Sequence, residues 1–228
     1  MGKNDNGNNG RTELVFVVDR SGSMGGLESD TIGGFNSMLS KQRTIAGECR
    51  VTTLLFDHRI ETLHNHLDIR EVNDLTSRDY WVRGSTALLD AIGLAIDRMI
   101  VTQRHTAAAY RAQHVLFVII TDGYENASRR YSLHQIKQMI TYERERYHWE
   151  FVFLGANIDA EQTAGDFGIS PRCATEFHAD GQGIKASFEA VACAATAVRG
   201  GADLDDLSAP DFLGGVRDDY RSRRRMKR

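Results

Sequence analysis

The sequence LVFVVDRSGSM (14–24) begins as an apolar run and ends in polar residues. The run is short and continuous, which is typical of a β-strand that is buried on both faces. Asp19, Ser21 and Ser23 then follow at alternate positions, with Gly22 between the two serines. An extended turn with this alternation can aim one carboxylate and two hydroxyls at a single point, and the glycine permits the bend. The fold and the function therefore depend on which other segments meet this strand end.

The rest of the chain alternates apolar strand-like runs with amphipathic helical patterns. Further strands are expected at 51–57, 60–69, 114–123, 149–157 and 173–178, and helices at 25–47, 84–100, 132–147, 159–167 and 182–198. The link between the strands at 51–57 and 60–69 is so short that these two must form an antiparallel hairpin. The alternation elsewhere predicts an α/β fold, with a doubly wound, mostly parallel central sheet, one antiparallel edge strand and helices on both faces.

One domain, residues 11–199, accounts for this pattern. Residues 1–10 are polar and rich in glycine and asparagine, so we expect a disordered N-terminal tail. From residue 200 the sequence becomes acidic and then basic, with six basic residues among the last eight. This segment, 200–228, is expected to be a flexible tail. It could contact nucleic acid or anionic lipid, or fold back on the aspartates that precede it.

The totals restrict the class of protein. The formal net charge of −3 argues against a protein built mainly to hold nucleic acid, apart from the basic tail. The three cysteines are far apart and match no CxxC pattern, which favours a reducing compartment. No apolar run approaches 18 residues, and the N-terminus has no apolar signal core, so no membrane span is expected. These features predict a cytoplasmic protein.

Three segments at strand ends or helix starts carry polar residues of matching character: DRSGS (19–23), GSTAL (84–88) and TDG (121–123). In a doubly wound sheet they should converge on the edge formed by the carboxyl ends of the strands. The convergent side chains offer only oxygen, and they are Asp19, Ser21, Ser23, Thr86 and Asp122. Such a set favours Mg²⁺ over Zn²⁺ or copper, and Mn²⁺ or Ca²⁺ would fit the same donors. Because hydroxyls are neutral ligands, the cation would still attract an anionic oxygen from outside.

At these residues the sequence resembles the von Willebrand factor type A (vWA) domains. Their metal-ion-dependent adhesion site, or MIDAS, combines D-x-S-x-S with a threonine and an aspartate that often lies in T-D-G. The resemblance covers about residues 11–198 and extends to the small stand-alone bacterial members of the family. It implies a Rossmann-like fold and a complete adhesion site. In that site, Asp19, Ser21 and Ser23 would bind the metal directly or through water, Thr86 would join on engagement, and Asp122 would act through water.

The leading hypothesis is therefore a metal-dependent protein-binding module that recognises an Asp or Glu of a partner. The rim of its site is expected to include Arg20, Ser85, Tyr124 and Glu125, and Ser85 also stands where a helix cap belongs. The alternative is a metal-dependent hydrolase of phosphate esters, in which the ion polarises a phosphoryl oxygen. No catalytic residue is predicted, because the sequence shows no base near the metal, no D-x-D nucleophile, no P-loop and no G-x-S-x-G elbow.

Histidines 58, 64 and 66 lie on or beside the expected edge hairpin. They could form a nitrogen-rich metal site, but a hairpin at the edge of a sheet makes solvent-facing side chains the expectation. Cys49, Cys173 and Cys193 are expected to be small core or near-surface residues without disulfide bonds.

Overall fold

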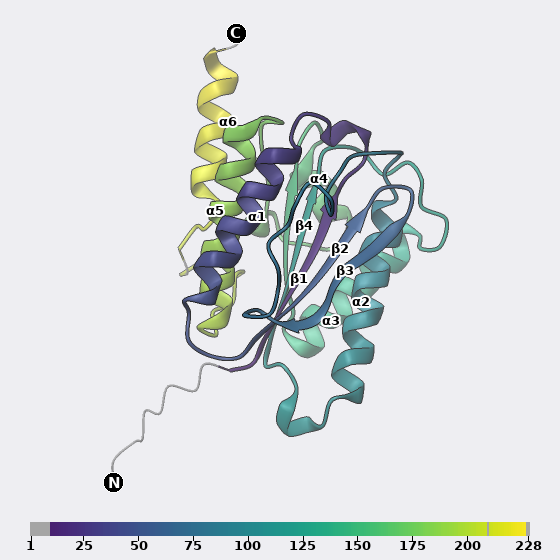
Figure 1. Cartoon of the computed structure of the whole chain (residues 1–228), viewed down its shortest axis with the longest axis vertical. Helices are drawn as coiled ribbons and strands as arrows, with labels where there is room; N and C mark the ends of the chain where they lie inside the picture. The colour runs from purple at the N-terminus through teal and green to yellow at the C-terminus, as the bar shows by residue number, and fades with distance from the viewer. Residues whose placement is uncertain (1–9, 209, 227–228) are drawn as a thin grey trace.

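The computed structural model describes residues 10–208 and 210–226, and the disorder expected for residues 1–9 lies outside these ranges. A central sheet lies between two layers of helices (Figure 1). Its strands are β1 (Thr12–Asp19), β2 (Cys49–Phe56), β3 (Ile60–Asp68), β4 (His114–Thr121), β5 (Glu150–Gly155) and β6 (Ala174–Glu176). They are ordered β3-β2-β1-β4-β5-β6. Within this sheet β2 and β3 pair antiparallel and the other neighbours pair parallel, so the predicted α/β fold is confirmed.

Helices cover both faces of the sheet. The helices are α1 (Glu28–Arg43), α2 (Leu88–His105), α3 (Leu133–Tyr147), α4 (Ala160–Asp166), α5 (Gly181–Arg199) and α6 (Gly214–Met226), with short 3-10 turns η1 (Gly22–Met24), η2 (Ala108–Tyr110) and η3 (Pro171–Cys173). Helices α1, α5 and α6 lie together on one face, while α2 and α3 lie together on the other (Figure 1). Helix α4 contacts β5 and β6 near one edge.

The central strands are continuous apolar runs because both of their faces are buried in the core. Every residue of β1 is buried, because helices cover both of its faces. Phe16 of β1 meets Phe35 of α1 edge to face, with ring centroids 5.2 Å apart, and Phe188 of α5 contacts Phe35 in the same way at 6.3 Å. Burying each of these rings contributes about 1.5–3 kcal/mol to folding. This packing holds β1 in place, and with it the loop that begins at the carboxyl end of β1.

The sheet topology brings three loops to one edge. Because β1, β2 and β4 run parallel, their carboxyl ends lie at the same edge, whereas β3 runs back to the opposite end. Residues 69–87 then return to the first edge before α2 begins. Asn36 fixes this return segment by two hydrogen bonds to the backbone of Leu75, of 2.7 and 2.9 Å. The Tyr80 hydroxyl also donates to the carbonyl oxygen of Asp19 at 2.5 Å.

The C-terminal segment differs from the flexible tail expected from its sequence. Residues 214–226 form helix α6, which packs against α5. Leu213 and Val216 are buried, and Arg217 donates to the carbonyl oxygens of Pro171 and Ala174 at 3.0 and 3.1 Å. The segment therefore folds because two apolar residues and one arginine dock it on the body.

The edge hairpin also departs from its expected pattern. His64 is buried rather than solvent-facing: it lies 3.0 Å from the Thr53 hydroxyl and stacks on Phe35. The reason is an irregular register beside Thr53, which turns His64 toward the helices. His66 pairs with Glu13 at 2.7 Å. Within residues 10–208 and 210–226, no three His, Cys, Asp or Glu side chains are grouped to hold a metal ion.

The helices are too short or too polar to cross a bilayer, as far as the described residues are concerned.

Candidate metal centre

The loop after β1 gathers the first oxygens of the candidate site. Asp19 is fully buried, and its carboxylate accepts hydrogen bonds from the backbone N–H of Ser21 and the hydroxyl of Thr121, both at 2.6 Å. The 3-10 turn η1 then brings the hydroxyl oxygens of Ser21 and Ser23 to 3.0 Å from each other. Ser21 is buried and Ser23 is exposed, so this oxygen cluster runs from the interior to the surface.

The second and third segments meet the first through close backbone approaches. The N–H of Gly22 donates to the carbonyl oxygen of Gly84 at 3.1 Å, which joins DRSGS to GSTAL. A methyl group added to Gly123 would lie 3.3 Å from the Ser23 hydroxyl oxygen and 3.8 Å from that of Thr86. The hydroxyls of Ser23 and Thr86 therefore flank the same point beside the TDG turn, where a side chain would be tightly packed.

Asp122 supplies the second carboxylate. It is buried, and the side-chain amide of Asn157 donates to it. Burial raises the pKa of Asp122 to about 6, and the negative charge of Asp19 adds to this shift. Burial likewise raises the pKa of Asp19, against the hydrogen bonds from Thr121 and Ser21. The charge of Asp19 thus lies close enough to disfavour the charged form of Asp122.

Neither carboxylate forms an ion pair with any residue in the described part of the chain. Buried charges in proteins are normally paired or coordinate a cation, because leaving them uncompensated is costly. Two buried carboxylates beside three hydroxyls form an all-oxygen donor set that suits a hard divalent cation. The residues present therefore fit the predicted ion.

The loop that follows Asp122 is held in place by one of the predicted rim residues, Glu125. Glu125, expected at the rim, turns its carboxylate inward and accepts from the backbone N–H groups of Leu89, Ala127 and Ser128 at 2.7–2.9 Å. Glu125 thus supplies an acceptor for a free N–H in the first turn of α2. The N-cap of this helix is Ala87, which forms no side-chain cap. The expected capping role of Ser85 is wrong for this reason.

The other rim residues separate into two groups. Ser85 is exposed, and Tyr124 is 61% exposed, so both side chains of these two predicted rim residues are accessible at the surface. Arg20, in contrast, is fully buried and pairs with Asp57 at 3.1 Å and Glu61 at 2.7 Å. It cannot be a surface contact residue, because its charge is already used inside the protein.

Sequence analysis missed three residues that shape the site: Thr121, Tyr80 and Asn157. Thr121 and Asn157 follow the same strand-end rule that identified Asp122, since they stand at the ends of β4 and β5. That rule could have found them. Tyr80 lies in an irregular loop with no comparable signal.

Comparisons with known proteins show the fold. The structure matches proximal thread matrix protein 1 from the mussel byssus in a form with a zinc occupied MIDAS motif (TM-score 0.55, 13% identity). It also matches the vWF domain of the pili tip protein Mfa5 from Porphyromonas gingivalis (0.55, 12%) and the manganese-loaded TRAP protein of Plasmodium vivax (0.53, 15%).

The matched regions cover 82%, 82% and 78% of this chain, respectively. They cover 46% of the mussel protein, 95% of the Mfa5 domain and 72% of TRAP, so the chain spans about half the length of the mussel protein. No protein-family model matches the sequence, and no curated protein does. At these identities the likeness establishes the von Willebrand factor type A fold that the sequence predicted.

Proposed function

We propose that the chain is a metal-dependent protein-binding module, which recognises a carboxylate of a partner through a divalent cation. The ion would be held by the oxygens of Asp19, Ser21, Ser23, Thr86 and Asp122. The observation that carries the proposal is the pair of buried carboxylates, Asp19 and Asp122, without a cationic side chain beside them in the described residues.

Each residue has a defined task in this proposal. The hydrogen bonds from Thr121 and Ser21 fix the orientation of Asp19, so its carboxylate need not rearrange to accept an ion. Ser23 and Thr86 add neutral oxygens and leave the charge of the ion largely uncompensated. The bound cation supplies electrostatic attraction for an anionic oxygen of the partner. Ser85 and Tyr124, exposed on either side, would contact the partner around its carboxylate.

Mg²⁺ is proposed on the chemistry of the donors. Carboxylate and hydroxyl oxygens suit Mg²⁺, with Mn²⁺ or Ca²⁺ as substitutes. The similar structures carry zinc in the mussel protein and manganese in TRAP by their descriptions. These ions support a divalent cation on this fold, and the choice among them is left to measurement.

We also propose a cytoplasmic location and a folded unit that begins near residue 11. Cys49, Cys173 and Cys193 are all free thiols, as a reducing compartment would keep them. Because α6 packs on α5, the proposed unit extends beyond residue 199 to residue 226.

The first experiment measures uptake of Mg²⁺, Mn²⁺, Ca²⁺ and Zn²⁺ by calorimetry on metal-free protein. Wild type is expected to take up one ion saturably, and Asp19→Ala to take up none at millimolar supply. Asp74→Ala is the matched control, since Asp74 is an exposed carboxylate that already pairs with Arg43 at 2.9 Å. Equal uptake by wild type and Asp19→Ala would sink the proposal.

The second experiment separates binding from catalysis. Affinity capture with wild type should retain partners that are lost both with chelator and with Asp19→Ala, and that are kept with Asp74→Ala. The same proteins are assayed with p-nitrophenyl phosphate. Metal-dependent turnover that disappears in Asp19→Ala would replace the binding proposal by the phosphoesterase alternative.

A further inference from the structure

A second cluster of charged side chains adjoins the loops of the proposed metal site. It is centred on Asp57, which directly follows β2. The Asp57 carboxylate is fully buried. One of its oxygens accepts from the Nε–H of Arg20 at 3.1 Å and from the Nε–H of Arg83 at 2.7 Å. The other accepts from the backbone N–H of Arg59 at 2.8 Å and lies 2.9 Å from Nδ1 of His58. Both oxygens of Asp57 therefore have basic or N–H partners. Asp19 and Asp122, in contrast, have no basic partner among the described residues.

The two arginines come from two different loops of the proposed site. Arg20 lies within DRSGS, and Arg83 directly precedes GSTAL. Their backbones also meet, since the N–H of Arg83 donates to the carbonyl oxygen of Arg20 at 2.9 Å. The neighbouring bond from the Gly22 N–H to the Gly84 carbonyl oxygen continues this contact toward the serines. One carboxylate and two backbone hydrogen bonds thus join segments about 60 residues apart in sequence.

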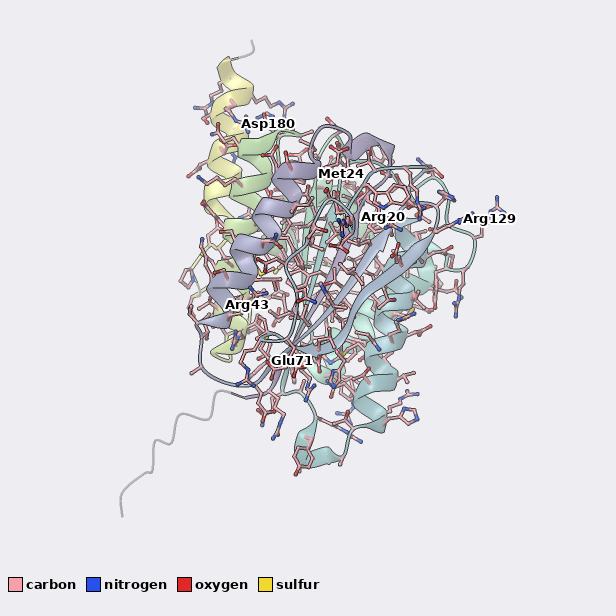
Figure 2. All side chains as sticks on the ribbon, viewed as in Figure 1. Arg20, Met24, Arg43, Glu71, Arg129 and Asp180 are labelled. Carbon is pink, nitrogen blue, oxygen red and sulfur yellow. The ribbon has the colours of Figure 1, made fainter. Side chains whose placement is uncertain are left out.

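Trp81 completes the cluster. The guanidinium carbon of Arg83 lies 4.3 Å from the centroid of the Trp81 ring, and that of Arg20 lies 5.5 Å from it. The side chain of Arg20 is 1% exposed and that of Arg83 is 29% exposed. Two like charges are held at one indole because the carboxylate between them offsets their repulsion. Figure 2 shows Arg20 near the carboxyl-end edge, beside Met24 and far from Glu71 at the opposite end.

We infer that Arg20, Asp57 and Arg83 form a clamp that positions the DRSGS and GSTAL loops, and that Asp57 and Arg83 are positioning residues for the ion. This inference rests on the proposed function. The ligand oxygens of Ser23 and Thr86 lie on separate loops, so their spacing depends on how those loops are joined. Partners that orient metal ligands without touching the metal typically change affinity by about 10–100-fold when they are removed.

Arg83→Gln is the variant that tests the clamp. Removing Asp57 would leave Arg20 buried without its carboxylate, and the protein could fail to fold. In Arg83→Gln the pair of Arg20 and Asp57 remains, so the metal-free melting temperature should change little. The Mg²⁺ dissociation constant is expected to rise about tenfold. Arg83→Lys should recover part of this loss, because lysine can pair with Asp57 but offers no planar group to stack on Trp81.

The matched control is Arg70→Gln. Arg70 is an exposed arginine paired with Asp68 at 2.5 Å, at the other end of the edge hairpin. This variant removes an arginine–aspartate pair that is more exposed and distant from the two loops, so its Mg²⁺ dissociation constant should equal that of wild type.

Hydrogen exchange on the metal-free proteins gives a second readout. The Gly22 amide, which donates across the two loops, should exchange faster in Arg83→Gln than in wild type or in Arg70→Gln. An unchanged Mg²⁺ dissociation constant in Arg83→Gln, with wild type binding normally, would overturn the clamp and leave the proposed function intact. No Mg²⁺ uptake by wild type would overturn both.

Discussion

Carboxylates lie at both ends of the sheet, but their partners differ between the two ends. At the carboxyl-end edge, Asp19 and Asp122 are buried and have no basic partner in the described residues. At the opposite end, Arg144 of α3 pairs with Asp205 and also donates to the carbonyl oxygen of Gly168. Asp19 and Asp122 thus lie beside hydroxyl groups and without an arginine among the described residues, whereas an arginine pairs with Asp205.

The difference teaches what distinguishes a structural carboxylate from a ligand. Asp74 and Asp205 are partly exposed, so arginines and water stabilise their charge. Asp57 is as buried as Asp19, yet two arginines neutralise it. Burial alone therefore does not mark a metal site. The proposed metal site rests instead on burial without a cationic partner from the part of the chain that the structure describes, beside further oxygens.

The largest effect is expected for Asp19→Asn, which keeps the shape of the side chain and removes its charge. With Mg²⁺ at a hundred times its dissociation constant, wild type should gain about 2.7 kcal/mol in free energy of unfolding, and the variant should gain nothing. In chelator the variant should be at least as stable as wild type, because a buried unpaired charge has gone. Urea unfolding with and without chelator measures both. A retained Mg²⁺ gain would contradict the contrast between the two ends.

Asp122→Asn should have a smaller effect of the same kind. Asp122 accepts a hydrogen bond from Asn157, and the resemblance to vWA domains implies that it would act on the metal through water. We expect the Mg²⁺ dissociation constant to rise about tenfold, as for other groups that act on a metal indirectly. Calorimetry on this variant and on Asp19→Asn compares the two carboxylates. A greater loss in Asp122→Asn would reverse their assigned roles.

Arg144→Gln examines the opposite end. The pair with Asp205 is partly exposed, so its loss together with the bond to Gly168 should lower the free energy of unfolding by about 1 kcal/mol. Asp205 remains hydrated, and the Mg²⁺ gain should match that of wild type. Thermal unfolding with and without Mg²⁺ provides the measurement. Loss of the Mg²⁺ gain in this variant would show that the two ends are coupled.

Local patterns in the sequence predicted much of the fold and the oxygen set. The strand at LVFVVD, the hairpin after it and the three polar loops each depend on a few adjacent residues and on the rule for strand ends. That rule placed Ser23 and Thr86 on neighbouring loops, and the structure brings both hydroxyls to the same glycine. Their role as metal ligands stays a prediction.

The residues that sequence analysis misjudged depend on distant partners. Arg20 is buried because Asp57, 37 positions away, pairs with it. Glu125 turns inward because the start of α2 needs an acceptor. Helix α6 forms because Leu213 and Val216 find apolar contacts on the body, although the surrounding sequence is strongly charged. Local composition contains none of these pairings, so no pattern within a short window could have predicted them.

The pH dependence of stability gives a further test, because Glu150 at the far end of the sheet titrates in an unusual range. Burial raises its pKa from 4.5 to about 7, and the nearby charges of Asp203 and Asp205 add to the shift. Below pH 4.5 the group is protonated in both the folded and the unfolded chain. As the pH rises from 4.5 to about 7, the unfolded chain loses its proton first, so the free energy of unfolding should fall.

Glu150→Gln removes this titration, and its urea unfolding at about pH 5 and about pH 8 should show a smaller decline than wild type. The effect should persist in chelator, because Glu150 lies at the end opposite the proposed ion. An equal decline in both proteins would mean that Glu150 keeps its ordinary pKa. In that case solvent would stabilise the charge of Glu150, as it does that of the partly exposed Asp205, and the contrast with Asp19 would become sharper still.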